Sequence, residues 1–148
     1  MSRTLLYDTR EEQLLEQLTK MNIHNATKIA QTLQGTIWRA SISSVHEQSD
    51  FDTPEGSDHT TSTNEPASII VKVTDRCLSK QGVSKVGRQT VRVHEDIESE
   101  AEILKHVTSN KDCPHSIVKF HKFMQTDTDC LLLMEDGGSS LFDFVVKA

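Results

Sequence analysis

The segment SIIVKVTD, residues 68–75, places one lysine in the middle of an apolar run. Its β-branched residues and polar flanks predict a buried β-strand. The lysine is Lys72, and lysine is among the residues that are least often buried. Because an isolated buried charge is costly, the Lys72 ammonium has to reach water or pair with an anion. We therefore expect a carboxylate partner for Lys72 elsewhere in the chain.

The composition is that of a protein with an ordinary core. The chain has 148 residues, of which 35% are hydrophobic and 26% charged, enough for one domain. Its net charge of −6 disfavours nucleic-acid partners. No apolar run suits a membrane span, and the N-terminus lacks the apolar block of a secretory signal. Cys77, Cys113 and Cys130 form no CxxC pair, so a reducing, cytoplasmic location is expected.

The first third of the chain predicts a helix and then two strands. Residues 9–20 have leucines at helical spacing, and Thr9 is the expected cap of a capping box. Residues 28–33 and 36–43 are predicted as strands that meet at Gly35. We expect residues 1–27 to be a helical extension of the domain that follows.

Two segments lack a regular apolar pattern. Residues 44–67 are rich in Ser, Thr, Asp and Glu, and cannot bury enough apolar surface to offset the entropy of ordering them. We predict a mobile insertion there. Residues 76–92 contain five basic residues and two glycines, and we predict a solvated connecting loop, since contact with acidic partners is the less favoured alternative.

The remaining segments complete an α+β domain over residues 28–148. Residues 94–109 predict the principal helix, and residues 116–125 and 129–136 predict two more strands. A second helix is expected to begin at Ser139 or Ser140. Together with the strand at residues 68–74 this makes five strands, for which a mostly antiparallel sheet with one packed helix is the natural solution.

The principal helix also offers the partner for Lys72. If Ile97, Ala101 and Leu104 face the sheet, Glu100 lies beside this apolar stripe, within about 100° of rotation. The other acidic residues of the helix lie further toward solvent. Glu100 is therefore the carboxylate that we expect to meet Lys72.

In this arrangement the segments IIVKV, ESEAEILKHV and CLLLMEDGGSSLFDFV resemble the N-terminal lobe of eukaryotic protein kinases over residues 28–148. The resemblance implies that Lys72 holds the α- and β-phosphates of ATP and pairs with Glu100, which stands in the family pattern E-x-x-I-L. It also implies further nucleotide-binding positions. These are Gly35 in the phosphate-covering loop, Ile70 as a roof over adenine, Met134 as gatekeeper, and Glu135 and Gly137 in the hinge.

The same resemblance limits what this sequence can do alone. It has no H-R-D catalytic loop and no D-F-G motif, which supply the base and the metal ligands. We therefore expect transfer of the ATP γ-phosphate to protein substrates, of the Ser/Thr type, only with a C-terminal lobe in the same or another chain. Mg²⁺ is expected only through that lobe, and no metal site is predicted here.

Two other functional interpretations remain open. Leu33 and Trp38 stand where the family loop has its outer glycines, which is compatible with a pseudokinase or regulatory interaction module of the same fold. An unrelated α+β interaction domain is the third interpretation. Lys72 is alternatively an edge-strand lysine that blocks aggregation, Glu100 a solvated charge, and Gly35 only a hairpin glycine.

Overall fold

The computed structural model describes residues 3–43, 66–139 and 145–146. The described part is an α+β fold, as predicted, with one five-stranded sheet, three helices and a small hairpin. The sheet contains β1 (Ile23–Gln31), β2 (Gly35–Ile42), β3 (Ala67–Asp75), β6 (Phe120–Gln125) and β7 (Asp129–Glu135). The other elements are α1 (Arg3–Lys20), α2 (Arg76–Gln81), α3 (Ile97–Thr108) and the hairpin strands β4 (Val83–Val86) and β5 (Gln89–Arg92).

All neighbouring strands of the large sheet are antiparallel, in the order β1-β2-β3-β7-β6. The segment that carries Lys72 is thus the central strand, with Ile37 of β2 on one side and Leu132 of β7 on the other. An edge-strand role for Lys72 is therefore wrong.

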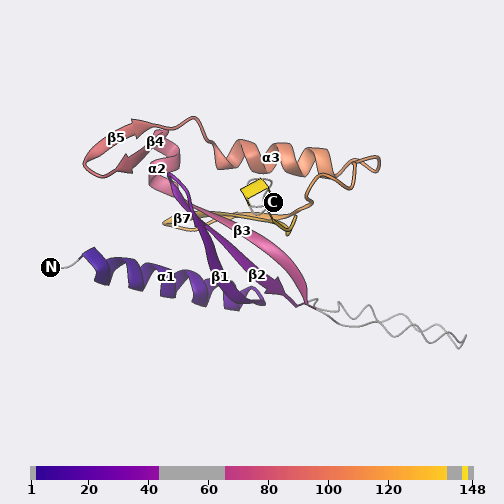
Figure 1. Cartoon of the computed structure of the whole chain (residues 1–148), viewed down its shortest axis with the longest axis horizontal. Helices are drawn as coiled ribbons and strands as arrows, with labels where there is room; N and C mark the ends of the chain where they lie inside the picture. Colours follow the sequence, from indigo (N-terminus) through magenta and orange to yellow (C-terminus); the bar gives the residue numbers. More distant parts are fainter. Residues whose placement is uncertain (1–2, 44–65, 140–144, 147–148) are drawn as a thin grey trace, which may run out of the picture.

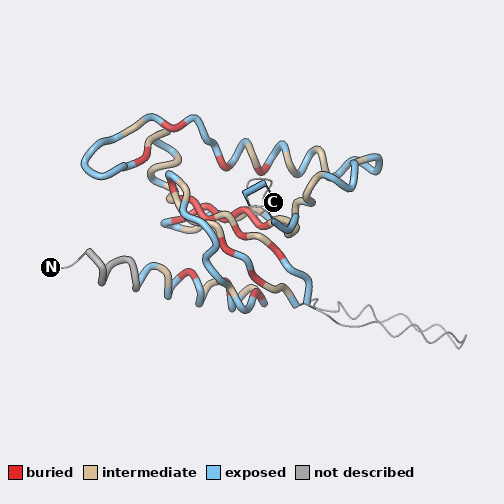
Figure 2. Tube along the Cα trace, in the orientation of Figure 1, coloured by how far each residue is buried: buried red, intermediate tan, exposed pale blue. Residues whose placement is uncertain are grey.

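The two faces of the sheet are covered by different helices (Figure 1). Ile69, Val71 and Val73 are buried on the α1 face, where they share a core with Leu14 and Leu18 of α1. The alternate residues of β3, including Ile70 and Lys72, point to the α3 face because successive strand residues point to opposite sides. Figure 2 shows the buried positions concentrated along the central strands between the two helices.

A smaller core lies on the α3 face. Ile97 and Ala101 of α3 pack with Cys130 and Leu132 of β7. Asp96 caps this helix, since its side chain accepts hydrogen bonds from the N–H groups of Glu98 and Ser99. The helix ends at Thr108, with Ser109 as its C-terminal cap. Of the three residues predicted to face the sheet, Ile97 and Ala101 are confirmed, whereas Leu104 is half-buried and does not belong to this core.

The N-terminal elements begin earlier than predicted. Helix α1 already includes Arg3, so Thr9 lies inside the helix and is not its cap. Strand β1 begins at Ile23 rather than at residue 28, and the expected boundary at residue 27 falls within it. Asn25 has a positive φ of 54° and lies at a register shift in this strand. This bulge interrupts the alternation by which a strand is recognised.

The basic segment 76–92 is not a plain loop, and that prediction is wrong. Asp75 caps α2 by accepting from the Leu78 N–H, and Gly82 ends the helix with a φ of 62°. The β4–β5 hairpin follows and extends from the end of the sheet (Figure 1). Of the predicted insertion, residues 44–65 lie outside the described residues, and β3 begins at Ala67. For the second helix, predicted to begin at Ser139 or Ser140, Ser139 lies in no helix and residues 140–144 are outside the described part.

Candidate functional site

The pairing expected between β3 and the principal helix is confirmed. The Lys72 Nζ donates a hydrogen bond of 2.6 Å to Glu100 Oε2. The Lys72 side chain is 17% exposed and that of Glu100 is 42% exposed, so the pair lies at the border between core and solvent. The alternative of Glu100 as a solvated charge without a partner is wrong. Ile97 and Ala101 anchor α3 on the sheet and thereby fix the direction of Glu100.

The Lys72 side chain stands on an apolar surface. Ile70 of β3 lies opposite Met134 of β7, and Lys72 lies opposite Leu132. Leu132 is buried, whereas Ile70 and Met134 are partly exposed. The structure therefore brings Ile70, Lys72 and Met134 together on the α3 face, with Glu100 above Lys72.

The segment after β7 is held by side chains rather than by a regular ladder. The Asp136 carboxylate accepts hydrogen bonds from Ser68 Oγ at 2.7 Å, Arg39 Nε at 2.8 Å and the Gly138 N–H at 2.9 Å. These partners favour the ionised form, and the hydrogen bond from Ser68 contributes most to lowering the pKa of Asp136. Asp136 therefore ties the end of β7 to β2 and β3.

The neighbours of Asp136 in the expected hinge are also fixed. The Glu135 N–H donates to Lys119 O at 2.8 Å, and Glu135 Oε2 accepts from the Lys119 N–H at 3.0 Å. A Cβ at Gly137 would lie 3.0 Å from the Val118 side chain, so a larger residue would be tight there. Glu135 and Gly137 thus lie in a defined backbone segment beside Met134.

Gly35 has a structural reason to be glycine. It is the first residue of β2, and a Cβ built on it would overlap the carbonyl group of Val73 in β3. The tight turn that precedes it is closed by a hydrogen bond of 2.9 Å from the Thr32 N–H to Gly35 O. Close packing of β2 on β3 therefore requires Gly35, whether or not a phosphate lies nearby.

Trp38 does not crowd the face that carries Lys72. It is 4% exposed in the core on the α1 face, and its Nε1 donates to Thr36 Oγ1 at 2.8 Å. The sequence alone did not show on which face of the sheet the Trp38 side chain lies, because the face depends on the register of β2.

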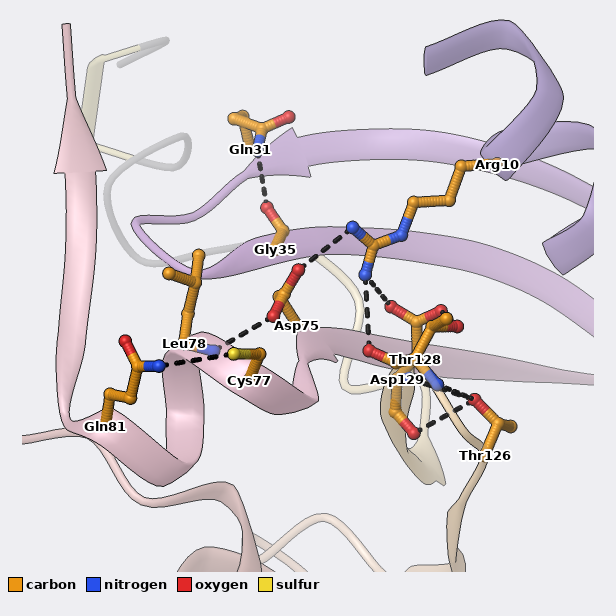
Figure 3. Close-up of polar contacts among 10 residues, drawn as sticks. All are labelled: Arg10, Gln31, Gly35, Asp75, Cys77, Leu78, Gln81, Thr126, Thr128 and Asp129. Carbon is orange, nitrogen blue, oxygen red and sulfur yellow. Dashed lines mark hydrogen bonds and ion pairs between the residues drawn. The ribbon is translucent and has the colours of Figure 1, made fainter. Parts of the chain in front are cut away.

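Sequence reasoning missed a charged cluster on the α1 side of the sheet (Figure 3). Arg10 of α1 donates to Asp75 Oδ2 at 2.9 Å, to the carbonyl of Thr128 and to the carboxylate of Asp129. Asp129 is only 7% exposed, so Arg10 neutralises a buried carboxylate and fastens α1 to the ends of β3 and β7. Arg10 is one of many charged residues on its helix, and nothing in its sequence context singles it out.

The turn of residues 32–34 is tied to the segment 76–92, a contact that the sequence did not predict either. Gln34 is 3% exposed, and its Nε2 donates to Val83 O at 2.9 Å and to Leu78 O at 3.3 Å. Ser84 Oγ donates to Leu33 O. The turn between β1 and β2 is therefore held from the outside by α2 and by β4.

Within residues 3–43, 66–139 and 145–146, no group of three or more His, Cys, Asp or Glu side chains is placed to hold a metal ion. No helix in this described part is long and apolar enough to cross a membrane. No model of a known protein family matches the chain. No curated protein matches it significantly.

Proposed function

We propose that this chain is the ATP-binding lobe of a protein kinase, of the Ser/Thr type. The observation that carries the proposal is the ion pair between Lys72 in the third strand and Glu100 in the following long helix. In protein kinases a lysine of the third strand holds the α- and β-phosphates and is oriented by a helix glutamate. The assignment is supported because this chain has the same residue types as the kinase pattern, a lysine and a glutamate, in the same two elements. The glutamate also stands in the E-x-x-I-L pattern.

The neighbouring residues have chemistry that suits the rest of a nucleotide. In the proposed complex the adenine ring lies against Ile70 and Met134, and its polar edge faces the backbone between Glu135 and Gly137. Gly35 lies at the turn that approaches the phosphates. Glu100 restrains the Lys72 ammonium, so that its charge is positioned before the nucleotide arrives and less ordering entropy is lost on binding.

Phosphoryl transfer needs further groups. The chain contains no H-R-D or D-F-G sequence to supply a base and Mg²⁺ ligands, so its own residues account for nucleotide binding alone. In the proposal, transfer to a protein substrate requires a second lobe that brings these groups and the metal ion.

The two faces of the same strands provide an internal control for nucleotide binding. We expect Mg-ATP to shift the methyl NMR signals of Ile70 and Met134, which share the Lys72 face, and to leave those of Ile69 and Leu133 on the α1 face almost unchanged. Lys72→Met should remove the shifts while the fold persists, because Met retains much of the apolar stem. Equal shifts on both faces, or none in the wild-type protein, would contradict the proposal.

A regulatory module of the same fold that does not use ATP is the second candidate. It is favoured by Leu33 and Trp38 at the outer glycine positions of the loop, and by the hydrogen bonds of Gln34 that hold the turn from outside. Thermal unfolding separates the two candidates. Stabilisation by Mg-ATP, lost in Lys72→Met, supports the kinase lobe, whereas equal melting with and without nucleotide supports the module.

A further inference from the structure

A cavity of about 520 Å³ lies away from the Lys72 site, on the α1 side of the sheet. Its walls come from α1, from the turn between β1 and β2, from α2 and from the β4–β5 hairpin. Figure 3 shows part of this region, with Gln31, Gly35 and Leu78 near Arg10 and Asp75. The volume is in the range of small-molecule sites, roughly 300–1,000 Å³.

Apolar side chains lie among the polar ones on both the inner and the outer walls of the cavity. Leu14, Val73 and Leu78 line it from α1, β3 and α2. Leu33 and Val86 also line it, yet they are 55% and 51% exposed. A single exposed apolar side chain needs no explanation, but two at one cavity offer apolar surface that a ligand would cover.

The charges around the cavity leave one cation without a partner. Arg10 is paired with Asp75 and Asp129, as described above. Lys28 Nζ lies 2.8 Å from Glu11 Oε1. Lys85, on the hairpin, forms no ion pair with any residue in the described part of the chain. The lining as a whole has three cations and three carboxylates, and Lys85 is the cation that is free to meet an anionic group.

We propose that this cavity binds a small amphipathic anion, with an apolar body and a single carboxylate, sulfonate or phosphate group. The apolar body lies over Leu14 and Val73 and is flanked by Leu33 and Val86, and the anionic group faces Lys85. The ligand bridges α1, the β1–β2 turn and the hairpin. This inference does not depend on the proposed nucleotide site: Gly35 lines the cavity and belongs to that site as well, but Ile70, Lys72 and Met134 lie on the other face of the sheet and do not line the cavity.

The dye 8-anilinonaphthalene-1-sulfonate combines an aromatic body with a sulfonate and is a suitable probe. Trp38 is the only tryptophan of the chain, and its indole donates to Thr36, a residue of the cavity wall. We expect bound dye to accept excitation energy from Trp38. Octanoate should displace the dye. Octanol lacks the charge, so we expect it to bind about tenfold more weakly than octanoate, which corresponds to roughly 1.4 kcal/mol.

Substitutions at exposed positions test the location without removing core residues. Leu33→Glu, Val86→Glu and Lys85→Glu should each weaken dye binding about tenfold or more, as expected for a loss of at least 1.4 kcal/mol. Ile103→Glu is the matched control, because Ile103 is 64% exposed on α3 and does not line the cavity. Far-UV circular dichroism of each variant checks that the fold is intact.

The outcomes divide clearly. Loss of binding in the three cavity variants, with retention in Ile103→Glu and displacement by octanoate, supports the site. Unchanged binding in Leu33→Glu and Val86→Glu, or an equal loss in Ile103→Glu, overturns it, since the dye then binds elsewhere. Equal displacement by octanol and octanoate overturns the assignment of an anionic ligand.

Discussion

Gly35 and Val73 lie so close across strands β2 and β3 that a Cβ on Gly35 would overlap the Val73 carbonyl. This contact joins the turn between β1 and β2 to the strand that carries Lys72. The nearest atoms belong to the backbone of β3, which cannot move away as the end of a flexible side chain can. The absence of a side chain at residue 35 is therefore a condition for the observed strand pairing.

Gly35→Ala should lower the free energy of unfolding by about 3 kcal/mol, the upper range for overpacking, because β2 must move away from β3. Gly87→Ala is the control. Gly87 has a φ of 62° but nothing within 4 Å of an added Cβ, so only the left-handed backbone is penalised, at about 1–2 kcal/mol. Urea denaturation measures both. A smaller loss for Gly35→Ala than for Gly87→Ala would contradict the close approach.

Arg10→Ala should lower the free energy of unfolding by about 1–2 kcal/mol, because the Asp129 carboxylate loses its charged partner in a mostly buried place. The estimate is moderate since the Arg10 side chain is 43% exposed. Lys20→Ala is the control: Lys20 and Glu16 are 71% and 68% exposed, so breaking their pair should cost under about 0.5 kcal/mol. Equal effects of the two substitutions in thermal unfolding would argue against Arg10 as a fastening residue.

Asp96→Ala should destabilise the protein by about 1 kcal/mol, because α3 loses its N-terminal cap. A hydrogen bond from the Ser99 hydroxyl is the largest cause that lowers the pKa of Asp96 in the folded state. A lowered folded pKa gives stability that is present above the unfolded value, about 3.9, and is lost as the pH falls below it.

Asp96→Asn separates the cap from the charge. Asn keeps the capping geometry, so we expect it to fall between the wild-type protein and Asp96→Ala at neutral pH. As the pH falls from about 4, near the unfolded value, through the lowered pKa of folded Asp96, the stability of Asp96→Asn should approach that of the wild-type protein. Denaturation at a series of pH values measures this. A constant difference between Asp96→Asn and wild type across the acid range would refute the role of the charge.

The three cysteines should differ in reactivity. Burial raises the pKa of the Cys130 thiol, which is 1% exposed, whereas Cys77 is exposed. Because the thiolate is the reactive form, a thiol reagent at about pH 8 should label Cys77 first and Cys130 only after unfolding. Mass spectrometry of labelled peptides identifies the sites, and Cys77→Ser should abolish the fast phase. Rapid labelling of Cys130 in the folded protein would contradict its placement under α3.

The sequence contained enough information to place the Lys72–Glu100 pair. The apolar run around Lys72 identified its strand, and Ile97 and Ala101 identified the inner face of α3. Helical geometry then put Glu100 next to that face. These are local periodicities, and the structure preserves them because each apolar stripe is buried against the other.

What the sequence did not predict depends on contacts between distant segments. The polar strand β1 is held by pairing with β2 and contains a bulge at Asn25, so it has no clear alternation. Arg10 acquires its role from Asp75 and Asp129, which only the fold brings near. The hairpin β4–β5 buries one side chain fully, Ser84, and so offers little apolar pattern to recognise.

The irregular strand pairings fall at the two borders of the sheet. Register shifts occur in the pairing of β1 with β2 and of β6 with β7, whereas the two central pairings are continuous. Bulges bend an edge strand and disturb its row of free N–H and C=O groups, which makes it a poor template for a strand from another molecule. The edge strands therefore disfavour strand pairing between molecules, whereas the regularly paired central strands position Lys72.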